Sequence, residues 1–141
     1  VLGAGRGILV EEQVRLGERR PIKSHRDLEV WQEAMKLAES CYQATGNFPT
    51  RETYGLASQI RRAAVSIPSN IAEGHARRSL PAYLNHLSIA LGSQAELETQ
   101  IELSVSLKLL PETSAESILA KVGQVGRMLH ALIRALEKSA G

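Results

Sequence analysis

Two carboxylates, Glu98 and Glu102, are four residues apart in a segment whose apolar spacing is helical, so they share one helix face. Such a pair can transfer protons or hold a divalent ion when a further group assists it. In helical bundles that group is a histidine three residues after a glutamate, because one turn then presents both ligands. No glutamate in this sequence has a histidine at that spacing. We therefore predict a solvated acidic face, with no catalytic residue, metal site or cofactor.

The histidines and the cysteine do not form a reactive cluster either. His25, His75, His86 and His130 fall in separate segments, as expected of surface or packing residues. Cys41 is the single cysteine, which excludes an intrachain disulfide, and its apolar neighbours predict a core side chain. No apolar run approaches the roughly 18 residues of a membrane-spanning helix. These features predict a non-enzymatic cytoplasmic protein without membrane contact.

A line of polar side chains at helical spacing is the most organised polar feature of the sequence. The members expected to form a network, with one carboxylate from the next segment, are Gln59, Arg62, Ser66, Asn70, Glu73 and Glu96. The favoured interpretation is structural, with Arg62 paired to a carboxylate such as Glu73 or Glu96. Loss of Arg62 would then leave a partly buried carboxylate unpaired.

The charge of the chain is small but unevenly distributed. The 141 residues carry a formal net charge of +2. Residues 1–26 and residues 51–78 each carry +3, whereas residues 80–110 carry −2. Such opposite regions suit an anionic partner, contact between copies of the chain, or both. The candidate phosphate-binding residues are Arg20, Lys23, Arg26, Arg61, Arg77 and Arg78. The alternative for these side chains is a solvated basic face without a ligand.

Four segments with apolar residues at spacings of three and four predict four helices. They begin near residues 28, 50, 79 and 113, and glycine or proline marks the ends of the first three. Short loops between consecutive helices require antiparallel neighbours. The predicted fold is therefore all-α, an antiparallel up-down-up-down four-helix bundle over residues 26–141. Residues 1–25 are predicted to form a flexible basic arm.

Two of the predicted helices carry features that bear on shape and core. Pro68 lies inside the second helix, where its ring removes a backbone donor and crowds the preceding turn, so we predict a kink there. In the first helix, the clearest apolar line is Leu28, Trp31, Met35, Ala38 and Tyr42, and it is widened by Val30, Ala34, Leu37 and Cys41.

Apolar residues outside the expected seams predict contact between subunits. Val30 and Leu37 in the first helix, with Ile89 and Leu103 in the third, exceed what one narrow seam requires. Extra apolar surface on a small bundle usually ends in a subunit contact. The sequence therefore predicts a homo-oligomer.

Three segments carry a resemblance to a known family: DLEVWQEAMKLA at 27–38, FPTRETYGLASQIRRAAVSIPSNIAEGHARRS at 48–79 and LNHLSIALGSQAELETQ at 84–100. In order and spacing, over about residues 26–138, the chain closely resembles bacterial four-helix-bundle proteins encoded inside intervening sequences of large-subunit ribosomal RNA genes. The accessory protein of diversity-generating retroelements resembles the same family and assists a reverse transcriptase through RNA and protein contacts. The resemblance implies a homopentamer without enzymatic activity.

Two functional interpretations are open at this point. In the first, the chain is an oligomer that binds RNA or DNA through its basic surface, as an accessory to a reverse transcriptase or in association with an intervening sequence. In the second, it is a structural or protein-interaction scaffold whose charges hold the oligomer together. Salt separates the two, because phosphate contacts weaken steeply with added salt whereas an apolar seam does not.

Overall fold

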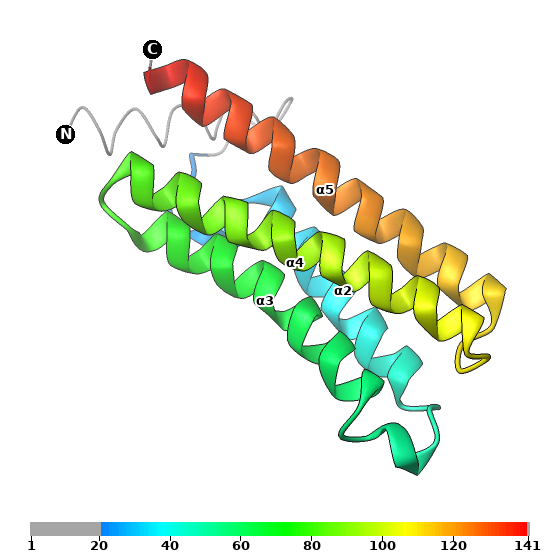
Figure 1. The fold of residues 1–141 in the computed structure, drawn as a ribbon. Helices are drawn as coiled ribbons and strands as arrows, with labels where there is room; N and C mark the ends of the chain where they lie inside the picture. Colours follow the sequence, from blue (N-terminus) through cyan, green and yellow to red (C-terminus); the bar gives the residue numbers. More distant parts are fainter. Residues whose placement is uncertain (1–20, 141) are drawn as a thin grey trace.

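The computed structural model describes residues 21–140, which form an all-α fold without strands (Figure 1). Its elements are η1 (His25–Asp27), α2 (Glu29–Thr45), η2 (Thr50–Glu52), α3 (Leu56–Ala76), α4 (Leu80–Ser106) and α5 (Glu112–Ala140). Helix α2 contacts α3 and α5, and α4 contacts the same two helices. The four-helix bundle predicted from the apolar spacing is therefore confirmed.

The helix starts show which local signals are reliable. The Ser79 hydroxyl accepts a hydrogen bond from the Ala82 amide at 3.2 Å and caps α4, so the predicted start of the third helix near residue 79 is confirmed. The prediction that the second helix begins at Thr50 is wrong, because a single turn of 3-10 helix and a further turn come first. The cap of α3 is supplied instead by Glu52, whose carboxylate accepts from the Leu56 amide at 3.1 Å.

The chain joins the bundle before residue 26. Ile22 is buried in the core, although the sequence analysis assigned residues 21–25 to the arm. The carboxylate of Asp27 accepts hydrogen bonds from the Lys23 amide at 2.8 Å and the Ser24 amide at 3.1 Å. These bonds hold the segment beside η1, so the bundle includes residues 21–25. The rest of the predicted arm, including Arg20, lies outside the described residues.

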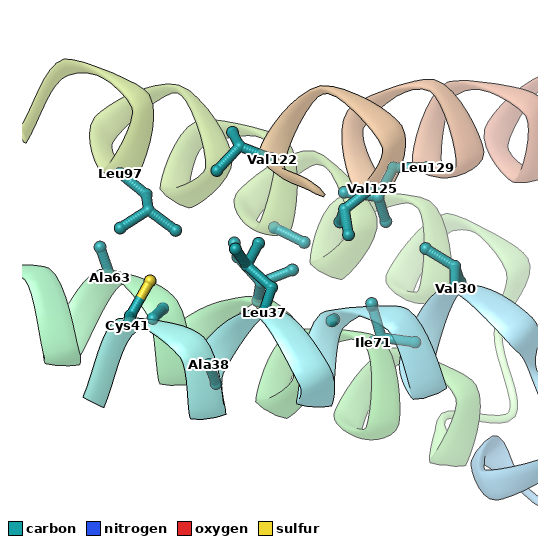
Figure 2. Packing of buried hydrophobic residues seen from close by; sticks show 14 of the residues in the cluster. Val30, Leu37, Ala38, Cys41, Ala63, Ile71, Leu97, Val122, Val125 and Leu129 are labelled. Carbon is teal, nitrogen blue, oxygen red and sulfur yellow. The ribbon is translucent and has the colours of Figure 1, made fainter. Parts of the chain in front are cut away.

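The core face of α2 agrees with the expectation in part, because Ala38 and the residues that widen the apolar line are buried, whereas two residues of that line are exposed. The buried side chains of this helix are Val30, Ala34, Leu37, Ala38, Cys41 and Thr45. Figure 2 shows Leu37 and Cys41 directed into the interior between the helices. Met35 and Tyr42, which belong to the predicted apolar line, are 40% and 47% exposed. Because α2 contacts α3 on one side and α5 on the other, its buried face points between them and turns these two residues outward.

Helix α3 runs unbroken from Leu56 to Ala76 through Pro68, and a kink at the proline stays a prediction. The proline ring is buried on the side of α3 that faces α2. The ring therefore contributes apolar contact between the two helices.

Helices α3 and α4 approach each other closely at Gly74. A Cβ atom there would lie 2.8 Å from the Cβ of His86 and 3.3 Å from the Tyr83 carbonyl oxygen. We therefore expect Gly74→Ala to lower the free energy of unfolding by about 1 to 3 kcal/mol, because the two helices must separate. Thermal melting followed by circular dichroism measures the change.

Gly92 on the exposed face of α4 provides the matched control. A Cβ atom at Gly92 would meet nothing within 4 Å. Gly92→Ala should leave the melting temperature unchanged or raise it, since alanine favours a helix over glycine by up to about 1 kcal/mol. If Gly74→Ala and Gly92→Ala have the same melting temperature, the close approach of α3 and α4 at Gly74 is contradicted.

Candidate nucleic-acid interface

The antiparallel order of the helices gathers basic residues at one end of the bundle. The start of α2 lies at the same end as the connection between α3 and α4 (Figure 1). There η1 contacts both α2 and α3, and His25 is close enough to His75 for their charges to interact. The basic side chains placed there, hereafter the basic end, are Lys23, Arg26, Arg77 and Arg78.

The side chains of the basic end differ in how far they are neutralised. Arg77 donates to the Glu73 carboxylate at 3.2 Å in an exposed ion pair. Lys23, Arg26 and Arg78 are exposed, and their side chains form no ion pair within residues 21–140. Three of the four charges therefore have no ion-pair partner among the described residues.

The histidine at the basic end adds little to this charge. Burial, followed by the nearby Arg26 and His75 side chains, lowers the pKa of His25 from its usual value. The His25 ring also contacts the Trp31 ring edge to face, with centroids 5.0 Å apart. His25 is thus neutral near pH 7 and helps to hold η1 on α2.

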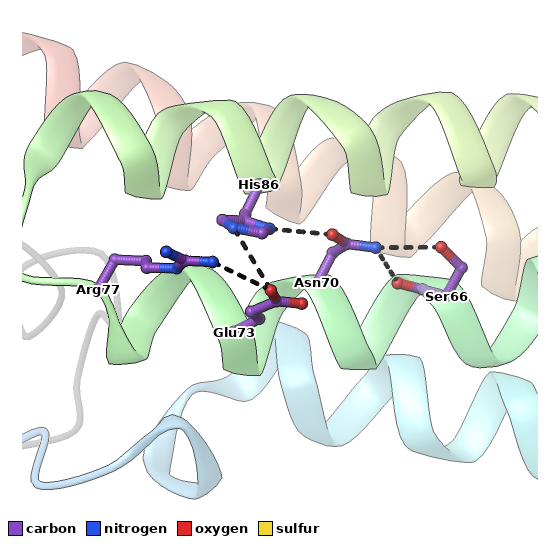
Figure 3. A network of polar contacts seen from close by, with 5 residues as sticks. All are labelled: Ser66, Asn70, Glu73, Arg77 and His86. Atoms are coloured by element: carbon purple, nitrogen blue, oxygen red, sulfur yellow. Dashed lines mark hydrogen bonds and ion pairs between the residues drawn. The ribbon is translucent and has the colours of Figure 1, made fainter.

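A polar network joins α3 to α4 next to the basic end (Figure 3). The Asn70 amide donates to the Ser66 hydroxyl at 3.0 Å, and the Asn70 carbonyl oxygen lies 3.1 Å from Nδ1 of His86. On the other side of the ring, His86 Nε2 lies 3.8 Å from the Glu73 carboxylate. The Ser93 hydroxyl donates to Ser66 at 2.8 Å and extends the network along α4.

Half of the residues predicted for the network take part in it. Ser66, Asn70 and Glu73 do so, through the contacts given above. Gln59, Arg62 and Glu96 are exposed, and their side chains make no hydrogen bond or ion pair with any other described residue. The pairing expected between Arg62 and Glu73 or Glu96 is therefore absent from the described residues of the single chain.

The sequence analysis missed the α4 side of the network. His86 and Ser93 are seven residues apart, which places them on one face of α4, and that face meets Ser66 and Asn70 of α3. A search for a second polar line at this spacing would have found them. This polar line is hard to recognise in the sequence because α4 is apolar around much of its circumference.

Arg61 lies away from the basic end and contacts α2 instead. Its Nε donates to the Thr45 hydroxyl at 2.8 Å, and its guanidinium lies 4.7 Å from the centre of the Tyr42 ring. Within one chain, Arg61 therefore makes the structural contacts that were expected of Arg62. A phosphate contact by Arg61 stays a prediction.

This placement reverses the expected effects of replacing the two arginines. Arg62→Ala should change the free energy of unfolding by about 0 to 1 kcal/mol, because the side chain is exposed and has no described partner. Arg61→Ala should lower it by about 1 to 2 kcal/mol through loss of the hydrogen bond and the cation–π contact. Melting both variants beside the parent checks the order. A larger loss for Arg62→Ala would mean that its partner lies outside the described residues or in another subunit.

Cys41 is a core side chain, as predicted. It is fully buried, and burial raises the pKa of its thiol to about 12 from an ordinary 9.0, against a smaller lowering by Lys121. The unfolded chain therefore loses this proton at lower pH than the folded chain does. The contribution of the thiol to stability is complete below pH 9.0 and declines as the pH rises toward about 12.

We expect the folded protein to resist thiol reagents. At neutral pH the thiol reacts only when the core opens, so labelling should be slower than in the denatured chain by about 1,000-fold or more. A colour reaction with an aromatic disulfide, with and without denaturant, measures this ratio. Equal rates would place Cys41 at the surface.

The described part of the chain has neither a metal-binding cluster nor a membrane-spanning helix. Residues 21–140 contain no group of three or more histidine, cysteine, aspartate and glutamate side chains arranged to hold a metal ion. Among the same residues, no helix has both the length and the apolar character needed to cross a membrane.

Comparison with known proteins identifies a family and a similar solved structure. The sequence profile of the family described as 23S rRNA-intervening sequence protein matches residues 26–131. Among solved structures, the chain is similar to a protein of unknown function from the S23 ribosomal protein family of Bacteroides thetaiotaomicron, with 25% sequence identity and a TM-score of 0.67. That similarity covers 74% of this chain and 97% of the other. No curated protein matches the chain.

Proposed function

This chain belongs to the 23S rRNA-intervening sequence protein family, and from that premise we propose that it is a non-enzymatic, oligomeric, cytoplasmic protein that binds RNA. The basic end is the proposed binding surface. Binding is led by charge and shape rather than by base identity, because a cluster of exposed arginine and lysine side chains attracts the phosphates of any nucleic-acid sequence.

One observation carries the proposal. Lys23, Arg26 and Arg78 come from two separate parts of the sequence, share one end of the bundle and have no acidic partner within the described residues. Like charges held together repel one another, so a protein gains stability when an anion neutralises them. A ligand with several regularly spaced phosphates satisfies three such charges at once.

Oligomerisation strengthens a weak contact of this kind. A homopentamer, which the family resemblance implies, presents five copies of the basic end to one nucleic acid. Once one subunit has bound, the others bind at a high effective concentration. The apolar side chains Ile89 and Leu103, exposed on α4, support a subunit seam. DNA is the other nucleic acid that fits this surface, and assistance to a reverse transcriptase is a compatible setting.

The second candidate function is a protein scaffold. It is favoured by the ion pair between Arg77 and Glu73, which shows that part of the charge is used within the chain. In this case the remaining charges serve contacts between subunits, and no nucleic acid is bound.

A gel-shift assay on a structured RNA at two salt concentrations tests the proposal. We expect the full chain to shift the RNA at low salt and much less at high salt, because bound phosphates release counterions. The chain lacking residues 1–20, which include Arg20, should keep most of this binding, since the basic end remains. Absence of any shift at low salt supports the scaffold instead.

A further inference from the structure

A shallow furrow runs along the outside of the bundle between α2 and α3. It consists of two adjoining hollows, of about 600 and about 570 Å³, that share Tyr42 and Val65 in their linings. One hollow reaches Trp31 and His25 near the start of α2. The other reaches Tyr54, in the turn that precedes α3.

Aromatic side chains are concentrated in this furrow. The chain has one Trp, three Tyr and one Phe. Three of these five, Trp31, Tyr42 and Tyr54, line the furrow. Tyr54 is 97% exposed, and Tyr42 is 47% exposed. Large aromatic rings are normally buried for stability, so two exposed tyrosines next to the half-buried Trp31 point to a surface that another molecule covers.

The furrow is also cationic at the end that holds Tyr54. The guanidinium of Arg61 lies over the Tyr42 ring, and the exposed Arg62 side chain lines the same hollow. Glu39 is the only carboxylate among the residues that line either hollow. The lining thus combines flat apolar rings with positive charge and little negative charge.

We propose that this furrow binds a single-stranded segment of RNA. Successive bases stack on Tyr54 and on the Arg61–Tyr42 pair, and the strand continues along the furrow to Trp31. The Arg62 side chain neutralises the phosphate backbone. Stacked bases on aromatic rings beside a basic groove are the usual means by which proteins hold single strands without reading their sequence. Trp31 and Tyr42 are about 16 Å apart along α2 at about 1.5 Å per residue, which suits a short run of nucleotides.

The proposal rests on the proposed function and adds a second, separate surface to it. The basic end holds phosphates of any structured RNA by charge, whereas the furrow holds unpaired bases by stacking. A duplex does not expose base faces, so it occupies the basic end alone. A single strand engages both surfaces.

The single tryptophan of the chain provides a direct probe. Because Trp31 lines the furrow, its fluorescence reports occupancy there. We expect a 12-nucleotide oligouridylate with a fluorescent end label to quench the fluorescence of Trp31 until the protein is saturated. The anisotropy of the RNA label should rise with the same midpoint concentration. A duplex RNA of equal length should change anisotropy with little quenching.

Variants at the far end of the furrow separate stacking from charge. Tyr54→Ala should weaken oligouridylate binding about fivefold or more and leave duplex binding unchanged, because one stacked base is lost. Tyr54→Trp should bind oligouridylate as tightly as the parent, because the indole ring also stacks on a base. Leu107→Ala, at an exposed apolar residue directly after α4 and outside the furrow, is the matched control and should bind as the parent does.

Each alternative outcome is decisive. Oligouridylate binding that is equal in Tyr54→Ala and the parent overturns the furrow and leaves RNA binding at the basic end intact. Failure of the parent to bind either RNA rejects the proposed function and the furrow with it. A change of sedimentation in Tyr54→Ala shows that a second copy of the chain covers the furrow, which also overturns the proposal.

Discussion

Replacing Arg77 and Arg78 together with alanine is expected to weaken the binding of structured RNA about tenfold or more near 0.1 M salt, because each lost phosphate contact removes a counterion-release contribution. Unrelated structured RNAs should lose affinity by similar factors, since the contacts are to phosphates. Fluorescence anisotropy of labelled RNA hairpins measures these losses. A loss confined to one RNA sequence contradicts charge-led binding.

The two arginines are not equivalent in the structure. Arg77 is held by Glu73 at 3.2 Å, whereas Arg78 has no ion pair within the described residues. Arg78→Ala alone should therefore account for most of the effect. A double variant at the opposite end of the bundle, Arg51→Ala with Lys108→Ala, removes the same charge and should change binding much less.

Glutamate at both Ile89 and Leu103 is expected to break the oligomer into monomers. These side chains are 44% and 45% exposed, and their separation of two heptads puts them on one face of α4. Two buried charges without partners are incompatible with an apolar seam, because each would have to lose its hydration. The parent should sediment at micromolar concentration near 77 kDa, five times the chain mass of 15.4 kDa, and the variant near 15.4 kDa.

A control variant guards against a general effect of added charge. Ser117→Glu adds a glutamate at an exposed polar position of α5 and should sediment like the parent. A parent protein that sediments as a single species of 15.4 kDa contradicts the oligomer and leaves Ile89 and Leu103 as solvent-exposed residues.

The number of helices and most of their ends were predictable from the sequence. Ser79 caps α4 as its side chain and position indicate, and Cys41 lies in the core as its neighbours indicate. These predictions rest on local signals, which a short stretch of chain determines by itself. The start of α3 was not predictable in this way, because a short 3-10 helix also begins at Thr50.

The direction of α2 side chains could not be predicted because it depends on neighbours. The line through Met35 and Tyr42 and the line through Val30 and Leu37 are both apolar at helical spacing. Which of them is buried depends on where α3 and α5 lie around α2, and no local signal specifies that. The exposed apolar residues of α2 are therefore Met35 and Tyr42, and the second of these became part of the furrow.

The same argument explains Arg61 and Arg62. Adjacent residues on a helix point about 100° apart, so one of the two contacts a neighbour and the other faces away. The sequence analysis assigned the structural role to Arg62 because it lies in line with Ser66 and Glu73. The structure gives intramolecular contacts to Arg61, because Thr45 and Tyr42 at the end of α2 lie within its reach.

The salt dependence of RNA binding tests the central claim most directly. The logarithm of the binding constant for a structured RNA is plotted against the logarithm of salt concentration, for the parent and for Arg77→Ala with Arg78→Ala. We predict a steep negative slope for the parent that becomes shallower by about 1 for each bound subunit of the variant, because Arg78 supplies most of the lost phosphate contact and Arg77 is held by Glu73. A parent that does not bind, or two parallel lines, contradicts the account.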